Sequence, residues 1–377
     1  MDELVTKPTG PETKPLAPSA PMALAFNGKF LSAHMTGVHR VADELLSAID
    51  QLVKPGDYQM RIIKPKDSKR EMGLTHFDEA VDGALTWQFW EQFELPRLAK
   101  KDELLVSLCN LSPLAKKRAV TMIHDAQVYL TPQSYSRLFR AWYRFALPRI
   151  GRKNLAILTV SDYSRQQLVR HGVARAEKIH VIHNGVDHIL RSDTEPEFVS
   201  HLQLEPRKYV CALANTQKHK NIEILCKAFA RPEMAGMKLV LMGASGKSDF
   251  EAKGIDVPDN VIFAGRVSDA QMRSLMEAAL CFACPSTTEG FGLPPLESML
   301  LGTPAICAPM GALPEVCGSH ALYAAHDDAG AWVEAMGALA QDSDDWTRRS
   351  TAGRAHAATF TWARAAKKLL GVIETIR

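Results

Sequence analysis

The chain has 377 residues, more than one hydrophobic core usually organises, so we expect two domains with a cleft between them. Hydrophobic residues make up 46% of the sequence and charged residues 23%, and no apolar run approaches the roughly 18 residues that a membrane-spanning helix needs. The formal net charge of +3 is too small to indicate nucleic-acid binding, and we expect no nucleic-acid partner.

The predicted elements begin after a proline-rich start. Residues 1–20 contain four prolines and no hydrophobic period, and we expect a disordered tail there. A first predicted domain, residues 21–190, opens with an apolar strand, a glycine-containing loop and an amphipathic helix. Its strand-like runs lie at residues 22–26, 59–63, 104–108, 119–123, 155–160 and 179–182. Helical stretches separate several of these runs, and the alternation indicates a parallel sheet.

A second alternating series predicts a second Rossmann-like domain, residues 207–358. Polar residues 191–206 fit a linker or a short helix between the domains, and residues 359–377 end the chain with a helical segment. The strand-like runs of the second domain lie at residues 209–213, 238–242, 261–264, 280–283 and 304–308. Because ligands bind beyond the carboxyl ends of strands in open parallel sheets, we expect a site on the strand-to-helix loops.

The cysteines indicate a compartment and exclude little else. There are seven, an odd number without a regular framework, and no charged-then-apolar leader follows Met1, so we expect a cytoplasmic protein. Cys281 and Cys284 form one C-x-x-C inside an apolar run, with no second Cys or His pair nearby. Zinc needs about four ligands, which favours a buried strand there over a metal or redox site.

Two glutamates eight residues apart flank the loop that follows the run at 280–283. Pro294 favours a helix start, which places Glu289 on the loop and Glu297 one turn inside the helix. Two glycines between them let backbone N–H groups approach a ligand, and a helix N-terminus attracts anions. The carboxylates could accept hydrogen bonds from the hydroxyls of a hexose and a ribose. The alternative is that Glu289 caps the helix and Glu297 is a solvated first-turn acid.

The whole segment E-G-F-G-L-P-P-L-E at 289–297, followed by G-T-P at 302–304 and G-A-L-P-E-V at 311–316, resembles the donor-binding region of glycosyltransferase family 4. The resemblance implies the α/β GT-B fold, with two Rossmann-like domains facing a central cleft, and sugar transfer with retention from a sugar nucleotide. It also implies that Glu297 binds the nucleotide ribose and that Glu289 faces the donor sugar. The loop residues implied to bind the donor are Gly290, Phe291, Gly292 and Leu293.

The basic loop K-H-K-N at 218–221 offers cations for a diphosphate leaving group, whose developing charge a metal or fixed cations must stabilise. Lys220 matches the lysine that similar enzymes use against the diphosphate. Many relatives carry an arginine where this chain has Asn215, so the second cation is open, with Lys218, His219 and Arg266 as candidates. A solvated basic turn is the alternative. The resemblance implies a reaction without a metal, and we expect no cofactor.

Two motifs of the first domain also resemble the family. The run at 119–123 ends in His124 and Asp125, which matches a motif whose histidine approaches the donor sugar. Asp125 could hold the imidazole, and a lone histidine here could also be structural. The segment T-G-V-H-R resembles a T-G-V-x-R pattern, with Gly37 and Arg40 as a loop for acceptor or phosphate, or with an ordinary loop glycine.

The resemblance covers about residues 22–370 and suggests front-face attack, in which a phosphate oxygen takes the acceptor proton. No enzyme base is then obligatory, whereas a double displacement would need a carboxylate beneath the anomeric carbon. The residues predicted to be catalytic are His124, Glu289 and Lys220. In similar proteins the last helix packs back on the first domain. Ser161 or Ser164 is expected to cap the helix that follows them.

A basic and aromatic stretch between Arg137 and Lys153 contains six Arg or Lys residues and no acidic residue. It could lie on the anionic inner face of a membrane and reach a lipid-linked acceptor. The alternative is an amphipathic helix that packs on its own sheet with its arginines in solvent.

We therefore predict a retaining hexosyltransferase that acts on a saccharide or lipid-linked acceptor in surface polysaccharide biosynthesis. Mannose from GDP-mannose is the first choice, because the first domain and the His-Lys-Asn segment resemble bacterial polysaccharide mannosyltransferases. Rhamnose, glucose and galactose donors stay open. The rival classes are a sugar-nucleotide epimerase, a phosphorylase and a non-catalytic sugar-nucleotide-binding protein. A dehydrogenase is disfavoured, because no G-x-G-x-x-G follows the first strand.

Overall fold

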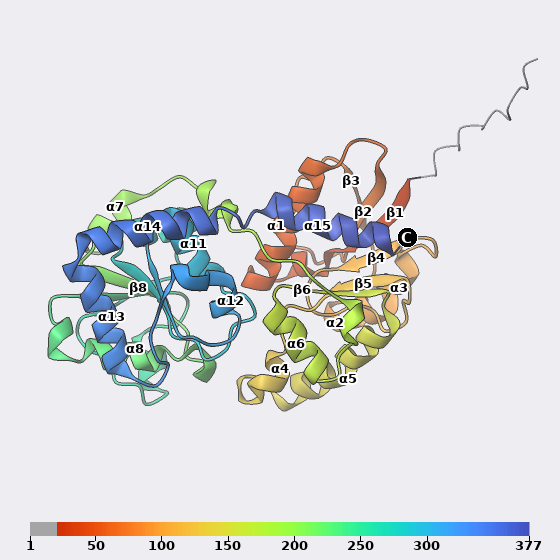
Figure 1. Cartoon of the computed structure of the whole chain (residues 1–377). Coiled ribbons are helices and arrows are strands. Elements are labelled where there is room, and N and C mark those ends of the chain that lie inside the picture. Colours follow the sequence, from red (N-terminus) through yellow and green to blue (C-terminus); the bar gives the residue numbers. More distant parts are fainter. Residues whose placement is uncertain (1–20, 377) are drawn as a thin grey trace, which may run out of the picture.

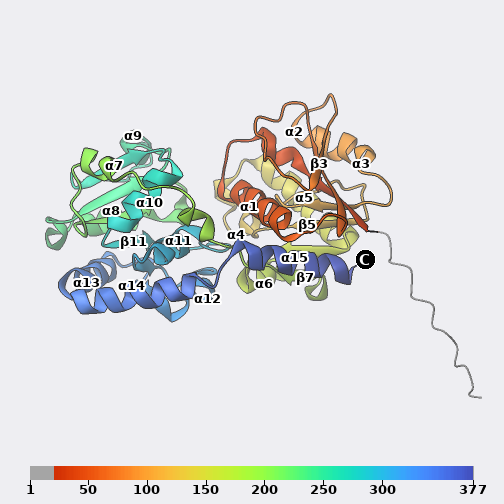
Figure 2. The same cartoon turned by 90° about the horizontal axis from the view of Figure 1, so that it is seen from above.

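The structure is a computed structural model that describes residues 21–376, so the tail predicted over residues 1–20 lies outside the described residues. Two α/β domains lie side by side, each built on a parallel sheet covered by helices (Figure 1; Figure 2). The alternation of strands and helices along the sequence is therefore confirmed as two Rossmann-like domains.

The N-terminal domain has a seven-stranded sheet in the order β3-β2-β1-β4-β5-β6-β7. Its strands are β1 Met22–Asn27, β2 Tyr58–Lys64, β3 Phe77–Val81, β4 Leu104–Ser107, β5 Ala119–Met122, β6 Ala156–Thr159 and β7 Ile179–Val181. The residues of β4, β5 and β6 are buried throughout, because helices cover both faces. The edge strand β3 was not predicted, since three of its five residues are exposed and the two acidic ones interrupt the apolar pattern.

The N-terminal helices connect these strands. They are α1 Gly37–Leu52, α2 Trp87–Phe89, α3 Leu95–Leu98, α4 Gln127–Leu130, α5 Arg137–Lys153 and α6 Asp162–Arg170, with a π-helical segment η2 Trp90–Glu94 between α2 and α3. Helix α1 buries its apolar stripe against the sheet. Helix α6 begins after Ser161, whose Oγ accepts a hydrogen bond from the Ser164 N–H, which confirms one of the two predicted caps.

The C-terminal domain has a six-stranded sheet in the order β10-β9-β8-β11-β12-β13. Its strands are β8 Tyr209–Leu213, β9 Lys238–Met242, β10 Val261–Gly265, β11 Cys281–Cys284, β12 Ala305–Cys307 and β13 Leu322–Tyr323. The C-x-x-C lies in β11 with both cysteines buried, as the apolar run predicted. All seven cysteines are unpaired.

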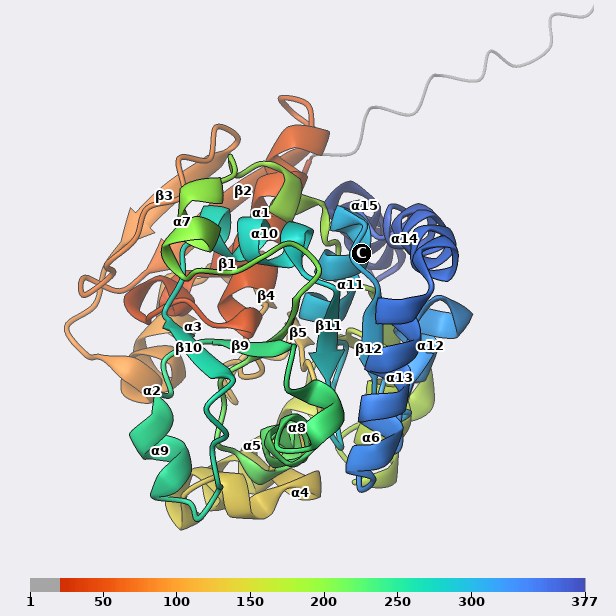
Figure 3. The ribbon, with the colours of Figure 1, turned by 90° about the vertical axis from the view of Figure 1, so that its left-hand side faces the viewer.

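Helices cover both faces of the second sheet because the side chains of a strand alternate between the faces. The helices are α8 Ile222–Phe229, α9 Lys247–Glu251, α10 Asp269–Ala278, α11 Leu293–Leu301, α12 Leu313–Cys317, α13 Ala329–Gln341 and α14 Ser343–Ala357. Helices α8, α9 and α13 share one core with the sheet, and α10, α11 and α12 share the other. Figure 3 shows α8 and α9 below β9 and β10, and α10 above them.

The chain crosses between the domains twice. It leaves the N-terminal domain through the turn η5 Asp187–Leu190 and the short helix α7 Pro196–His201, and it returns to form α15 Trp362–Thr375, which lies along α1 (Figure 1). The two crossovers touch, since the Trp362 N–H donates to Asp187 Oδ1 at 2.8 Å. Gly185 permits this approach, because a Cβ there would lie 2.2 Å from the Trp362 nitrogen.

Candidate active site

A cavity of about 950 Å³ lies between the domains, at the carboxyl ends of both sheets. In each sheet the strand order reverses beside the cavity, between β1 and β4 and between β8 and β11, which is where open α/β sheets bind ligands. All predicted site residues line the cavity except Lys218, His219 and Arg266. The residues that do so are Gly37, Arg40, His124, Asp125, Lys220, Glu289, Gly290, Phe291, Gly292, Leu293 and Glu297.

The donor loop, residues 289–293, is held by contacts from both domains. Gly292 has a φ of 100°, a left-handed conformation that favours glycine, and α11 starts directly after it. The Gly290 carbonyl accepts hydrogen bonds from Ser161 Oγ at 2.6 Å and from Ser164 Oγ at 3.1 Å. The first turn of α6 in the N-terminal domain thus fixes the loop that starts α11 in the C-terminal domain.

Lys220 and Glu289 form an ion pair inside the cavity, with Nζ 2.8 Å from Oε1. Burial opposes the charge on Lys220, but the Glu289 carboxylate outweighs it and raises the lysine pKa. Burial likewise opposes the charge on Glu289, but Lys220 and a hydrogen bond from Ser286 lower its pKa. Both groups are therefore charged near neutral pH, and an incoming anion would compete with Glu289 for the lysine.

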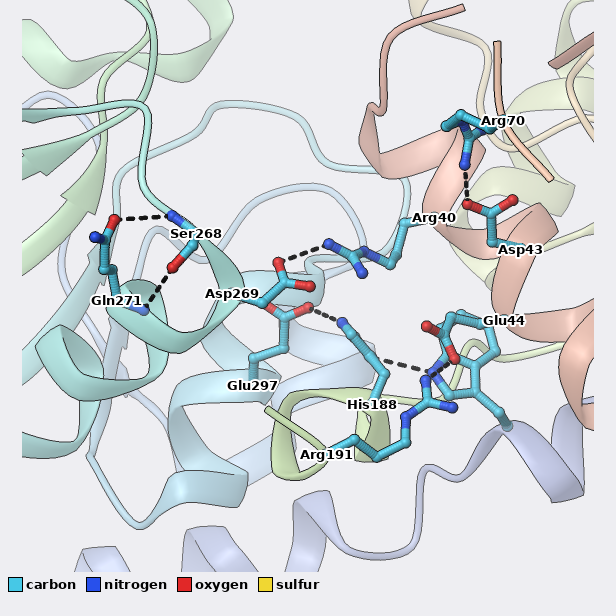
Figure 4. Close-up of polar contacts among 11 residues, drawn as sticks. Arg40, Asp43, Glu44, Arg70, His188, Arg191, Ser268, Asp269, Gln271 and Glu297 are labelled. Carbon is cyan, nitrogen blue, oxygen red and sulfur yellow. Dashed lines mark hydrogen bonds and ion pairs between the residues drawn. The ribbon is translucent and has the colours of Figure 1, made fainter. Parts of the chain in front are cut away.

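Three residues were predicted as candidates for the second cation. Lys218 and Arg266 are exposed and His219 is buried, and none of the three lines the cavity. Asn215 lines the cavity, but its Oδ1 accepts the Gln217 N–H and it carries no charge. Arg40 lines the cavity from the opposite domain, and its Nη2 lies 2.7 Å from Asp269 Oδ1 of α10 (Figure 4). Within residues 21–376, the lysine and arginine side chains that line the cavity are thus Lys220 and Arg40.

His124 is buried at the end of β5, and its Nε2 lies 2.8 Å from the Leu108 carbonyl oxygen. A carbonyl can only accept, so Nε2 carries the proton and Nδ1 has a free lone pair. Burial lowers the His124 pKa to about 4, although the Leu108 carbonyl opposes this, so the ring is neutral at pH 7. The Leu108 carbonyl, and not Asp125, orients the imidazole, since Asp125 Oδ1 accepts the Gln127 N–H.

Asp125 lies directly against the donor loop. A Cβ placed on Gly290 would sit 3.0 Å from the Asp125 Cβ, so a side chain there would crowd this contact between the two domains. Burial raises the Asp125 pKa. Gly37 shows no such constraint, because a Cβ at this position would meet nothing within 4 Å. Its place at the start of α1 still directs a helix N-terminus toward the cavity.

Glu297 is buried on α11, and its Oε1 lies 3.1 Å from His188 Nε2 (Figure 4). The His188 Nδ1 accepts a hydrogen bond from the indole N–H of Trp362 at 3.1 Å. His188 was not predicted as a site residue, because it directly follows the N-G-V-D segment and no pattern marks it as a partner of a glutamate far along the chain.

An aromatic stack forms part of the N-terminal wall and was also not predicted. Phe139 and Tyr143 lie one turn apart on α5 with ring centroids 4.1 Å apart, and Tyr135, just before the helix, stacks on Phe139 at 5.1 Å. All three line the cavity. Burial raises the Tyr135 pKa to about 12, so its hydroxyl is neutral. The aromatic residues that suggested a membrane surface are thus partly turned toward the cavity.

Two Rossmann-like domains that enclose such a cavity define the GT-B class of glycosyltransferases. Residues 82–189 match the family model described as Glycosyltransferase Family 4, and residues 193–356 match Glycosyl transferases group 1. O-antigen chain mannosyltransferase B of Escherichia coli is 31% identical over 261 residues, which cover 66% of this chain and 68% of the relative. The chain belongs to glycosyltransferase family 4 and is a hexosyltransferase, and retention of configuration fits this family.

A second relative and a solved structure are also similar to this chain. O-antigen chain mannosyltransferase RfbU of Salmonella typhimurium is 27% identical over 252 residues, which cover 65% of this chain and 67% of the relative. The solved structure of HepE of Anabaena superposes with a TM-score of 0.71 at 17% identity and covers 94% of this chain and 100% of that chain, which supports the fold alone. No helix between residues 21 and 376 is long and apolar enough to cross a membrane.

Proposed function

We propose that this glycosyltransferase transfers mannose from GDP-mannose to a saccharide or lipid-linked acceptor in the biosynthesis of a surface polysaccharide. The observation that carries the proposal is the charged Lys220–Glu289 pair beside the N-terminus of α11, in one cavity with Glu297. Both relatives described above are named O-antigen chain mannosyltransferases, which supports mannose and a polysaccharide product.

In this proposal the donor lies along the C-terminal wall. Its diphosphate displaces Glu289 from Lys220 and meets the backbone amides at the start of α11. Fixed cations and amides stabilise the charge that builds on the leaving diphosphate, and Arg40 supplies a second cation. Once released, Glu289 accepts a hydrogen bond from a hydroxyl of the sugar, and Glu297 accepts one from a hydroxyl of the ribose. The acceptor hydroxyl attacks from the face that the diphosphate leaves, and a phosphate oxygen takes its proton.

His124 forms the opposite wall of the donor site in this scheme. Its Nδ1 accepts a hydrogen bond from a hydroxyl of the transferred sugar, because the ring is neutral and the Nε2–H donates to the Leu108 carbonyl. The aromatic stack of Tyr135, Phe139 and Tyr143 lies on the same side of the cavity, where the acceptor would enter.

The donor is tested by thermal shift with GDP, UDP, dTDP and ADP at equal concentration, followed by hydrolysis and transfer assays with GDP-mannose. We expect the largest stabilisation from GDP, an α-linked mannosyl product by NMR, and activity that persists in EDTA. UDP is the main alternative, because the HepE structure was solved in complex with UDP-glucose. Stabilisation by UDP alone would overturn the choice of donor. Stabilisation by none of the four would overturn the proposal.

The same experiment separates the rival classes. An epimerase would convert the sugar nucleotide without an acceptor, and a phosphorylase would need inorganic phosphate. A non-catalytic binding protein would be stabilised by the nucleotide but would release no mannose, even with an acceptor. Transfer that depends on an acceptor saccharide is expected only of the proposed activity.

A peripheral contact with an anionic membrane is part of the same proposal, as is a cytoplasmic location. On α5, Leu138 is 82% exposed and Phe145 46% exposed, next to Arg137, Arg144 and Arg149. Exposed apolar side chains among arginines suit the interface of an anionic bilayer. Vesicles of phosphatidylglycerol should therefore sediment the protein, and the Arg137/Arg140/Arg144 triple alanine variant should bind them several-fold more weakly. Equal, negligible binding by both proteins would contradict the contact.

A further inference from the structure

The Glu297 carboxylate meets a histidine that comes from the other side of the domain boundary. The side chain of Glu297 is 5% exposed and that of His188 is 4% exposed, and Oε1 lies 3.1 Å from Nε2. Both residues line the cavity. The contact joins α11 of the C-terminal domain to the turn η5 in the first crossover, so the carboxylate that faces the donor is tied to the connection between the domains.

The protonation of His188 follows from its second partner. An indole N–H can only donate, and that of Trp362 points at His188 Nδ1 from 3.1 Å, so Nδ1 must be the acceptor. The ring proton therefore sits on Nε2, the nitrogen that faces Glu297. Trp362 thus fixes the tautomer in which His188 presents an N–H to the carboxylate. A tryptophan that is only 3% exposed also leaves the ring little freedom to rotate.

The chain of contacts from Glu297 through His188 to Trp362 ends where the two crossovers between the domains touch. Trp362 is the first residue of α15, and its backbone N–H donates to Asp187, the neighbour of His188. Relative motion of two domains must be absorbed by the segments that connect them. The contact from His188 to Glu297 therefore links the carboxylate to the segments that connect the domains.

We infer that His188 is a positioning residue, held by Trp362, which aims the Glu297 carboxylate at the ribose of the bound nucleotide. The inference rests on the proposed function, in which Glu297 binds that ribose. With Oε1 beside His188, the second oxygen, Oε2, is the one left for the ribose hydroxyls. Without His188 the carboxylate would lose the N–H that faces it, and a buried charge without a donor is costly.

The first test compares the binding of GDP and 2′-deoxy-GDP by calorimetry, because a ribose contact discriminates between them. We expect the wild type to prefer GDP by about ten-fold, as for the loss of one hydrogen bond to a charged group. His188→Ala should reduce this ratio to about two, and Glu297→Gln should do the same. The double variant should lose no more than either single variant, because the two residues act through one contact.

The second test is kinetic and separates positioning from a structural role. His188→Ala should raise the KM for the donor about ten-fold and change kcat less than three-fold. His188→Gln should rescue at least half of the affinity, since an amide N–H can reach the place of Nε2. Trp362→Phe should lie between wild type and His188→Ala, because it removes only the indole N–H.

The controls are chosen so that each failure has one meaning. His180→Ala on β7 removes a half-buried histidine outside the cavity, and its GDP to 2′-deoxy-GDP ratio should equal that of the wild type. If the wild type binds neither GDP nor UDP, the proposed function fails. If the wild type discriminates against 2′-deoxy-GDP and His188→Ala does so equally while keeping its thermal midpoint, the inference about His188 is overturned.

Discussion

Burial acts differently on the titratable groups of the two walls of the cavity. On the C-terminal wall, Lys220 and Glu289 keep each other charged although both are sheltered from water. On the N-terminal wall, burial makes His124 neutral and raises the pKa of Asp125. An ion pair can exchange one partner for a charged ligand, whereas a neutral imidazole suits hydroxyls. The contrast is between the Lys220–Glu289 pair and His124, since the N-terminal wall also carries Arg40, paired with Asp269. It supports the proposal that the diphosphate of the donor lies on the C-terminal wall.

The largest effect should come from removing the cation of the charged wall. In Lys220→Met, the leaving diphosphate loses its closest cation, and we expect kcat to fall by about 10² to 10³. The thermal midpoint should also be measured, because Glu289 loses the partner that lowers its pKa. Lys220→Arg is the matched control, since it keeps a positive charge and should retain most of the activity. A kcat for Lys220→Met within three-fold of the wild type would remove the contrast between the walls.

The lowered pKa of His124, on the N-terminal wall, predicts how stability depends on pH. His124 has a pKa of about 4 in the folded protein and an ordinary value of about 6.5 when unfolded, so the unfolded chain takes up the proton first. The contribution of His124 to stability is therefore complete above pH 6.5 and is lost as the pH falls toward 4, by up to about 3 kcal/mol. Chemical denaturation between pH 7 and pH 4 measures this loss.

The control for this prediction keeps the hydrogen bond and removes the titration. His124→Gln can still donate to the Leu108 carbonyl, so its stability should depend less steeply on pH than that of the wild type. His219 contributes in the same direction, because burial and Lys220 also lower its pKa to about 4, and the slope should therefore not vanish. If the unfolding free energy of His124→Gln depends on pH as steeply as that of the wild type, the pKa of His124 is not lowered by burial as described.

The fold was largely predictable because buried strands are short apolar runs and the helices between them are amphipathic. The strands that escaped prediction are β3, whose residues are mostly exposed, and β13, which has two residues. The charged wall was predictable too, since the glutamates and glycines of the donor loop lie within nine consecutive residues.

The contacts that join the walls were not predictable from the sequence. Arg40 and Asp269 are 229 residues apart, and Asp162 and Glu315 are 153 residues apart. Such pairs form only when the two domains face each other, and no local pattern carries their spacing. The role of His188 could not be predicted for the same reason, since its partner Glu297 lies in the other domain.

One of these contacts predicts a smaller effect, on the distance between the walls. Glu315 of α12 accepts the N–H groups of Asp162 and Tyr163 at the start of α6, at 2.8 Å and 2.9 Å, and it lies 3.1 Å from His183 Nε2. A carboxylate at a helix N-terminus contributes about 1 kcal/mol. Glu315→Gln should therefore favour an open form, with a larger radius of gyration by X-ray scattering and a KM for the donor raised about five-fold.

The comparison variant for Glu315 is Glu334→Gln, which removes an exposed carboxylate from α13, away from the boundary between the domains. It should leave both the radius of gyration and the KM unchanged. Equal scattering curves for Glu315→Gln and the wild type, without ligand, would mean that this contact does not hold the walls together.

The smallest effect on kcat/KM is expected for the two predicted cations that do not line the cavity. Lys218 and Arg266 are exposed and do not line the cavity, so we expect Lys218→Ala and Arg266→Ala to keep kcat/KM within about two-fold of the wild type. Arg40→Met should instead lower kcat/KM about ten-fold, because Arg40 lines the cavity opposite Lys220. The three variants remove one positive charge each, so a general effect of net charge would reduce all three alike. A ten-fold loss in Arg266→Ala would mean that the loop after β10 moves into the cavity when the donor binds, and the second cation would then belong to the C-terminal wall.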